Sequence, residues 1–298
     1  MTVGMRVALK IAYDGAAFYG YQRQPDRRTV EGECLRALQA AGIIMSPSEA
    51  FFRSASRTDR GVSAIGNVIA FNTHFRGDAV LGAFNDKARD VWAWAIAEVP
   101  DDFHPRRAIE RWYRYHLFGD VSSARLRKAA ALFIGDHDFR AFTSEPPRGP
   151  STIRHIDVSQ DAGVTWIDVR ARSFRRGMVR RIVAAMVAYA QGDVTVDAIV
   201  EALRGVTPKR TFGTIPAEPL FLMDVNYDVP FRIIVKPKVR SEWSVMKRDA
   251  DLQLRFVRLL ERAIQSGEAI SVRGDVALAS GKVRKGFSRT HDTGHGGI

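Results

Sequence analysis

The chain has 298 residues, 46% of them hydrophobic, and carries 45 Lys and Arg against 33 Asp and Glu, a formal net charge of +12. This composition excludes a disordered chain, and the longest apolar run, residues 182–190, is far shorter than the ~20 residues of a membrane span. The single cysteine, Cys34, excludes internal disulfides and a zinc site of several thiolates. Without an apolar signal-peptide core, we expect a cytoplasmic protein with no membrane partner and a polyanionic ligand, most simply nucleic acid.

In the first half, alternation of apolar and polar residues predicts strands over residues 7–13, 64–71 and 111–118. The first of these strands is expected to be half-buried and to end at the turn formed by Asp14 and Gly15. Thr29 is the predicted N-cap of a helix that Gly42 ends. Residues 92–99 fit either a helix or a strand.

In the second half, helical spacing predicts helices over residues 126–133, 178–189 and 195–203. Two strands, residues 153–158 and 164–174, are joined by a tight turn at residues 161–163. Such a short connection requires antiparallel pairing, which argues against a purely parallel, doubly wound sheet. Interleaved strands and helices therefore predict an α+β fold of two halves, with a boundary near residues 104–111.

Positive charge is concentrated in several segments. Three arginine clusters fall within residues 53–60, 106–114 and 172–181, and guanidinium groups suit RNA phosphates. Residues 231–298 hold 14 Lys and Arg against 7 Asp and Glu, a net +7. Within them an amphipathic helix is predicted over residues 249–265, and the Gly-rich residues 281–298 are expected to be mobile.

Common cofactor motifs are missing from the sequence. It has no Walker loop, no G-x-G-x-x-G after a strand, no H-E-x-x-H and no G-x-S-x-G elbow. Its seven histidines lack metal-ligand spacing outside His291 and His295. We therefore expect neither a cofactor nor a metal.

One short segment remains as a candidate for chemistry. In it, Asp59 lies between Arg57 and Arg60, just before Gly61, which permits a sharp turn. A loop aspartate that caps a turn would explain this spacing. A carboxylate kept charged by neighbouring guanidinium groups, and able to act as a nucleophile, would explain it as well.

Five ordered stretches resemble the TruA family of tRNA pseudouridine synthases, including its archaeal branch. They are SRTDRGVSA at residues 56–64, KIAYDGAAFYGYQRQ at 10–24, FHPRRAIERWYRYHL at 103–117, GDHDFRAF at 135–142, and FRRGMVRRIV at 174–183 followed by PLFLMDVNY at 219–227. A lone R-T-D is weak evidence, whereas collinear matches over about residues 5–228 are specific.

The resemblance implies a fold and an activity. The fold is α+β, with two ferredoxin-like or RRM-like halves, residues 1–106 and 107–230, that share a central antiparallel sheet with an active-site cleft between them, followed by a basic extension, residues 231–298. The activity is isomerisation of a flipped-out uridine to pseudouridine at tRNA positions 38–40, in the anticodon stem-loop. The family also implies a homodimer.

The same resemblance implies residue roles. Asp59 matches the catalytic aspartate, Tyr113 the tyrosine that stacks on the uracil, and Arg180 the arginine that pairs with the aspartate. Arg57 matches an arginine that assists base flipping, and Leu222 lies in an apolar strip lining the pocket. Without the family match, Tyr113 would be read as a core aromatic and Arg180 as a surface helix residue.

Two departures from the family pattern stand out. Ser63 replaces a frequent histidine and is not expected to be catalytic. Arg175, Arg176 and Gly177 replace a more apolar stretch, and a glycine in the first helical turn costs about 1 kcal/mol relative to alanine. Tyr115 is assigned to packing.

Alternative functions are a non-catalytic RNA-binding protein with two RRM-like modules and a metal-dependent nuclease. The second is disfavoured because carboxylates are not clustered. For the synthase, covalent attack by the aspartate and abstraction of a ribose proton are both open.

Overall fold

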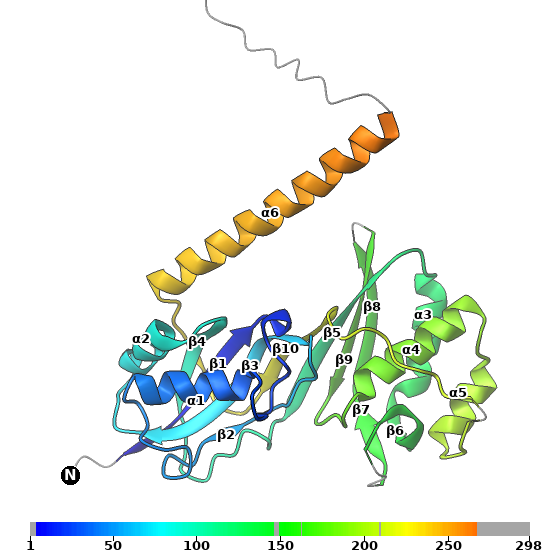
Figure 1. Cartoon of the computed structure of the whole chain (residues 1–298). Helices are drawn as coiled ribbons and strands as arrows, with labels where there is room; N and C mark the ends of the chain where they lie inside the picture. The colour runs from blue at the N-terminus through cyan, green and yellow to red at the C-terminus, as the bar shows by residue number, and fades with distance from the viewer. Residues whose placement is uncertain (1–3, 146–148, 162, 209, 267–298) are drawn as a thin grey trace, which may run out of the picture. The chain divides into compact units, whose positions relative to one another are not determined.

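One mixed sheet organises the chain up to Trp243 (Figure 1). The computed structural model describes residues 4–145, 149–161, 163–208 and 210–266. Among these residues, the chain divides into a compact unit that ends at Trp243 and a second unit that begins at Ser244. The first unit contains a nine-stranded sheet in the order β11-β4-β1-β3-β10-β5-β9-β8, with β2 paired to β3. The α+β class predicted from the sequence is therefore confirmed.

The strands of this sheet take up most of the predicted strand segments. They are β1 (Met5–Tyr13), β2 (Arg53–Ser54), β3 (Ser63–Thr73), β4 (Val91–Glu98), β5 (Glu110–Phe118), β8 (His155–Asp161), β9 (Val164–Ala171), β10 (Leu220–Asn226) and β11 (Arg232–Ile233). A second, two-stranded sheet consists of β6 (Gly135–His137) and β7 (Ser151–Ile153). Residues 92–99, which the sequence left undecided, fall largely in β4.

Helices cover the sheet in two groups (Figure 1). They are α1 (Val30–Ala40), α2 (Asp78–Lys87), α3 (Ser123–Phe133), α4 (Met178–Gln191) and α5 (Val196–Leu203), with short 3-10 turns η1 (Gly15–Ala17) and η2 (Arg140–Phe142). One more helix, α6 (Pro237–Ser266), begins in the first unit and runs through the described part of the second. Thr29 and Thr195 cap α1 and α5 through their side chains, as predicted. The sequence did not predict α2, whose N-cap Gly77 makes no side-chain hydrogen bond.

The sheet is not wholly antiparallel, which corrects the sequence prediction. β10 pairs antiparallel with β5 but parallel with β3, through Phe221 opposite Ser63 and Leu222 opposite Ala64. Tight turns force antiparallel pairing only between strands adjacent in sequence, as for β8 and β9. The chain between β3 and β10 is long, so their relative direction is free.

β1 is buried on both faces rather than half-buried as expected. Lys10, 8% exposed, pairs with Asp224 and lies over the rings of Trp94 and Phe231 at 5.8 and 5.3 Å. Close by, Val239 at the start of α6 packs with neighbouring aromatic side chains of the same unit. The predicted extension 231–298 is thus divided, because residues up to Trp243 belong to the first unit.

In the second unit, α6 continues to Ser266 and includes the predicted helix 249–265. The residues expected to be mobile, 281–298, lie outside the described part of the chain. None of the described helices is long and apolar enough to cross a membrane.

Leu222 offers a test of how strongly β10 joins the two parts of the sheet. It is fully buried between β3 and β5, so Leu222→Ala should lower the free energy of unfolding by about 2–5 kcal/mol. Ile109→Ala truncates a side chain that is 47% exposed and should cost less than about 1 kcal/mol. Urea denaturation measures the free energy of unfolding of both variants. Equal decreases would show that β10 does not form a buried connection between β3 and β5.

Candidate active site

The loop that carries Asp59 connects β2 to β3 and is held from two sides. The Thr58 carbonyl accepts a hydrogen bond from the Tyr21 amide at 3.1 Å, and the Thr58 and Tyr13 hydroxyls are 2.9 Å apart. Gly61 has φ +87°, a left-handed conformation that glycine adopts without strain. The Asp59 side chain, 29% exposed, therefore projects from a fixed backbone.

A close backbone approach fixes the other end of this loop. A Cβ on Gly15 would lie 2.5 Å from the carbonyl of Val62, so only glycine fits there. The Ser63 hydroxyl accepts a hydrogen bond from the Gly15 amide at 3.0 Å. At the position where the TruA family often has histidine, this serine therefore stabilises the turn.

Two arginines from the α4 region face Asp59. Arg180 lies in the first turn of α4; its Nη1 is 3.2 Å from Asp59 Oδ2 and its Nε donates to the Ile215 carbonyl at 2.8 Å. Arg176 Nε is 3.8 Å from the other carboxylate oxygen, and this arginine is 73% exposed. The pairing of Asp59 with Arg180 that the resemblance predicts is therefore present in the fold, although the two residues are 121 positions apart in sequence.

The entry to α4 differs from the sequence expectation. Gly177 is the N-cap of α4 and does not lie in the first helical turn. Its φ of +70° is left-handed, a conformation that glycine adopts without strain, so this residue does not weaken the helix. The Arg176 carbonyl accepts hydrogen bonds from the Thr143 hydroxyl at 3.1 Å and the Ser144 amide at 3.3 Å. The segment after η2 thus holds the turn that places Arg176 and Arg180.

Tyr113 and Leu222 lie side by side in the sheet. In register, Leu222 of β10 is opposite Tyr113 of β5 and opposite Ala64 of β3. The Tyr113 ring packs edge-on against Phe174, with ring centroids 5.2 Å apart and an interplanar angle of 88°. Burial raises the pKa of Tyr113 to about 12, so its phenol is neutral at physiological pH. Tyr115, 3% exposed, is part of the core as expected.

Arg111 supports the Asp59 loop from inside, a role that the sequence did not indicate. It is 6% exposed and donates to the Ser56 hydroxyl at 3.0 Å, to the Ala55 carbonyl at 3.2 Å and to the carbonyls of Arg106 and Arg172. Burial lowers the pKa of this guanidinium. A strand pattern cannot reveal such contacts, because they link β5 to three separate loops.

The prediction that the arginines of residues 106–114 hold RNA is therefore wrong for two of them. Arg111 is internal, and Arg114 donates both hydrogen bonds to Asp168 at 2.8 Å. Arg57, in contrast, is exposed, and within the described chain its side chain makes no hydrogen bond or ion pair.

Two surface hollows lie apart from Asp59. One is lined by Arg28, Glu33, Arg36, Arg89 and Asp90, and the other by Arg6, Phe51, Arg53, Asn72 and residues 101–104. In the described part of the chain, no group of three or more His, Cys, Asp or Glu residues could hold a metal ion.

Comparison with known proteins identifies relatives of this chain. A family model described as tRNA pseudouridine synthase matches residues 129–228. The tRNA pseudouridine synthase A of Pyrococcus furiosus is 47% identical over 239 residues, which cover 77% of this chain and 86% of that protein. Its counterpart from Thermococcus kodakarensis is 41% identical over 270 residues, covering 89% and 98%. That of Methanococcoides burtonii is 41% identical over 239 residues, covering 76% and 84%.

Among solved structures, a chain of a Cbf5-Nop10-Gar1 complex is similar over 61% of this chain and 54% of that chain. Its TM-score of 0.28 and 12% identity are too low to support an argument about the fold.

These relatives place the chain among the RNA-modifying isomerases. The chain belongs to the tRNA pseudouridine synthase A family. Its reaction is the isomerisation of uridine to pseudouridine in tRNA.

Arg180 is expected to serve both the site and the fold. Arg180→Ala removes the ion pair to Asp59 and the bond to Ile215, so it should lower the free energy of unfolding by about 1–3 kcal/mol and slow pseudouridine formation at least tenfold. Arg180→Lys keeps the charge but has a single ammonium for two partners, and it should recover only part of both losses. Denaturation measures the loss of stability, and single-turnover assays measure the loss of rate. Wild-type rates in both variants would contradict a role of the Asp59–Arg180 pair in the reaction.

Proposed function

We propose that Asp59 is the catalytic residue and that its substrate is a uridine on the 3′ side of the tRNA anticodon stem-loop, at positions 38–40. The observation that carries this proposal is the Asp59–Arg180 pair, because it combines a partly exposed carboxylate with a guanidinium from a distant element. The enzyme is proposed to act in the cytoplasm. The anticodon target is inferred from the family resemblance and is compatible with the exposed arginines near Asp59.

A stacked uracil is out of reach of a protein carboxylate, so the nucleotide must be extruded from the RNA at a cost of a few kcal/mol. Asp59 then attacks the nucleoside covalently or abstracts a ribose proton. The bond between N1 and C1′ breaks, the ring rotates and a bond forms between C5 and C1′. C5 loses a proton and N1 gains one, so the reaction is an isomerisation without net oxidation.

Other side chains are assigned roles from the family resemblance. Tyr113 provides the aromatic face for the uracil, a contact worth about 1–3 kcal/mol per base. Leu222 lines the apolar floor beside it. Arg57, exposed and without an intramolecular partner among the described residues, occupies the space that the flipped base leaves. The cleft for the RNA is proposed to lie between the halves formed by residues 1–106 and 107–230.

Asp59→Asn is the direct test. The amide retains the shape of the carboxylate but can neither act as a nucleophile nor accept a proton, so pseudouridine formation should fall by at least a thousandfold. Binding of unmodified tRNA should stay within a few-fold of wild type, since the RNA phosphates are held by arginines. Carbodiimide mapping of the tRNA transcript locates the product and measures its yield.

A matched control is Asp86→Asn, which neutralises an exposed aspartate of α2 and should leave the yield unchanged. Substantial activity of Asp59→Asn would refute the catalytic assignment. Product outside positions 38–40 would refute the proposed target. Uridine recovered unchanged with the wild-type protein would favour the non-catalytic RNA-binding alternative.

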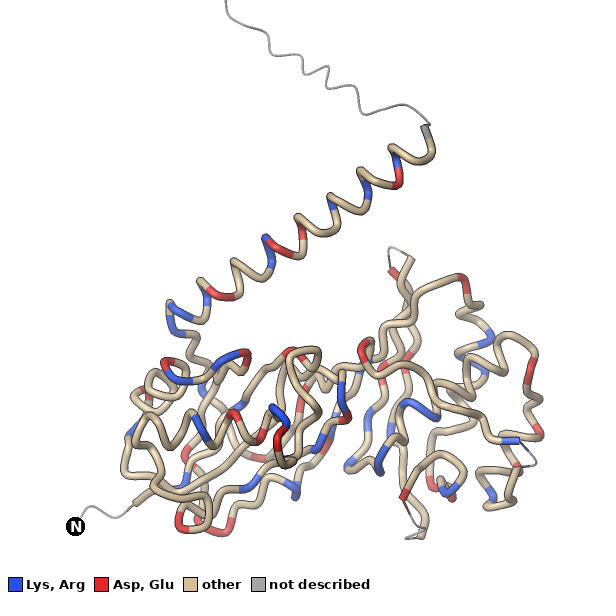
Figure 2. The backbone as a smooth tube through the Cα atoms, in the orientation of Figure 1, with Lys and Arg blue, Asp and Glu red and all other residues tan. Residues whose placement is uncertain are grey.

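We further propose that the enzyme is a homodimer in which the second unit contributes an interface. The part of α6 after Ser244 exposes large apolar side chains on one side, among them Met246, Leu252, Phe256, Leu260 and Ile264. Helical spacing places four arginines on its other side, Arg248, Arg255, Arg258 and Arg262. Figure 2 shows positions of Lys and Arg along α6. An apolar face of this extent normally requires a covering partner, and a second copy of α6 is complementary to it.

Sedimentation equilibrium tests the dimer. The wild-type chain should have twice its monomer mass of 33.2 kDa, and the double variant Phe256→Glu with Leu260→Glu should dissociate because charges are placed on the apolar face. Arg258→Glu, on the basic side, should remain dimeric. A monomeric wild type would refute the homodimer, whereas an intact dimer in the double variant would place its interface elsewhere.

A further inference from the structure

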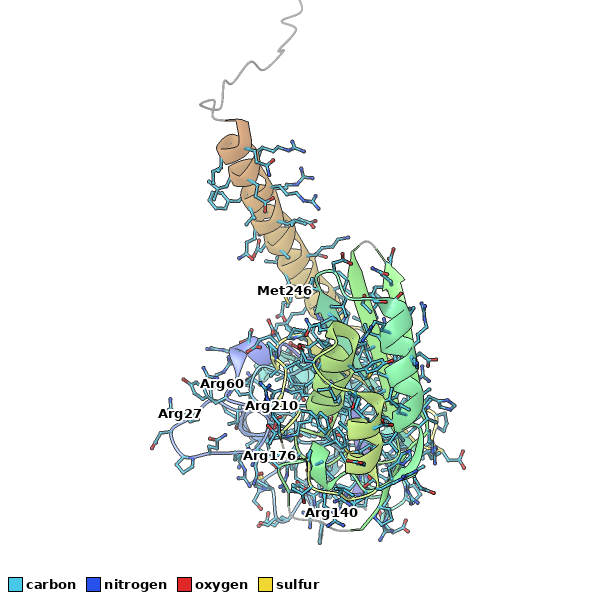
Figure 3. The ribbon with its side chains drawn as sticks, turned by 90° about the vertical axis from the view of Figure 1, so that its right-hand side faces the viewer. Arg27, Arg60, Arg140, Arg176, Arg210 and Met246 are labelled. Carbon is cyan, nitrogen blue, oxygen red and sulfur yellow. The ribbon has the colours of Figure 1, made fainter. Side chains whose placement is uncertain are left out.

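A cluster of two arginines and one tyrosine lies beside the Asp59 loop, and it joins Arg60 of that loop to Tyr19 and Arg27 of another loop. The guanidinium carbons of Arg27 and Arg60 lie 4.5 and 4.2 Å from the centroid of the Tyr19 ring. Figure 3 labels both arginines, with Arg27 extending outward from the body. Tyr19 is 39% exposed, and the two arginines are exposed as well. One aromatic ring therefore holds two cations at the surface.

These two cations lack the partners that neighbouring arginines have. Arg28 pairs with Asp90 at 2.8 Å, and Arg23 lies 3.6 Å from Glu31. Among the described residues, the side chains of Arg27 and Arg60 have neither a hydrogen-bond acceptor nor a carboxylate within ion-pair distance. Two like charges held near one ring without a counter-ion repel each other, so an anionic ligand stabilises this arrangement.

The cluster is fixed relative to Asp59 by backbone contacts. The Tyr19 amide donates to the Arg28 carbonyl at 2.8 Å, which closes the loop on itself. The Tyr21 amide donates to the Thr58 carbonyl at 3.1 Å, and a Cβ added to Gly20 would lie 3.3 Å from the amide nitrogen of Arg60, so the two loops lie close together. Arg60 also follows Asp59 directly in sequence. A ligand held by the cluster therefore lies beside the Asp59 loop.

We propose that Arg27 and Arg60, positioned by Tyr19, form a clamp for backbone phosphates of the RNA strand that carries the target uridine. This inference rests on the proposed function of Asp59. Guanidinium forks bind phosphate oxygens with charge-assisted hydrogen bonds, and such contacts set the register of the RNA without reading its sequence. Because guanidinium groups lie over its ring, Tyr19 positions them and does not serve as a stacking platform for a base.

The first experiment measures how salt affects tRNA binding by the full chain. Each phosphate contact contributes about 0.7–0.9 to the slope of log affinity against log salt, so Arg27→Gln and Arg60→Gln should each lower the slope by that amount. Between 50 and 200 mM salt, the factor by which tRNA affinity falls should therefore be about threefold smaller for each variant than for the wild type.

The matched control is Arg76→Gln. Arg76 is exposed and follows the far end of β3, whose 11 residues separate it from the Asp59 loop by about 33 Å. It should leave the slope unchanged.

The second experiment separates positioning from charge. Tyr19→Phe keeps the aromatic ring and should bind tRNA like wild type. Tyr19→Leu keeps both arginines but removes the ring that positions them, so it should raise the dissociation constant for tRNA several-fold. Arg27→Gln should raise KM without changing kcat, because Arg27 holds RNA and takes no part in bond changes. Thermal denaturation verifies that every variant is folded.

The outcomes distinguish this clamp from the proposed function. Slopes for Arg27→Gln and Arg60→Gln equal to that of Arg76→Gln would overturn the clamp while the wild-type enzyme still forms pseudouridine. Equal binding by Tyr19→Leu and Tyr19→Phe would overturn the role of the ring. If Asp59→Asn retains activity, the catalytic proposal fails, although the clamp variants would still report phosphate contacts.

Discussion

The placement of β10 between β3 and β5 is the constraint on which the site depends. It puts Ala64, Leu222 and Tyr113 in one row across three strands, although they come from widely separated parts of the chain. Ala64 follows the Asp59 loop by only a few residues, so the same row brings that loop beside Tyr113. The hydrogen-bond ladder of a sheet tolerates little slippage when its side chains are buried, which makes this register a rigid frame for the site.

The arginines divide according to whether the fold supplies them with acceptors. Arg111 is buried, and its donors reach carbonyls and the Ser56 hydroxyl, so it ties the Asp59 loop to its neighbours. Arg180 divides its donors between Asp59 and a carbonyl. Arg27, Arg57 and Arg60 have no such partners among the described residues, and we propose that their charge binds the RNA. The net charge of +12 therefore overstates the charge that RNA meets at the site.

The chain after β10 illustrates how composition can mislead about boundaries. Residues 231–298 share a basic character, yet β11 pairs with β4, and Glu242 accepts a hydrogen bond from the Trp92 indole at 2.7 Å. These contacts bury a face of β1 that alternation alone predicted to be exposed to solvent. A change in average charge does not reveal which apolar residues, such as Val239, complete a core.

Sequence by itself predicted most of the local elements and, through the family resemblance, the reaction. Period-two and helical patterns, the caps Thr29 and Thr195, and the segment around Asp59 are properties of neighbouring residues, so they can be read directly. Only the tertiary structure decided that β10 runs parallel to β3, that Gly177 precedes α4, and that Arg111 is internal. The tertiary structure also brings the guanidinium groups of Arg27 and Arg60 onto the Tyr19 ring. Those features depend on contacts between segments distant in the chain, and no pattern within one segment encodes them.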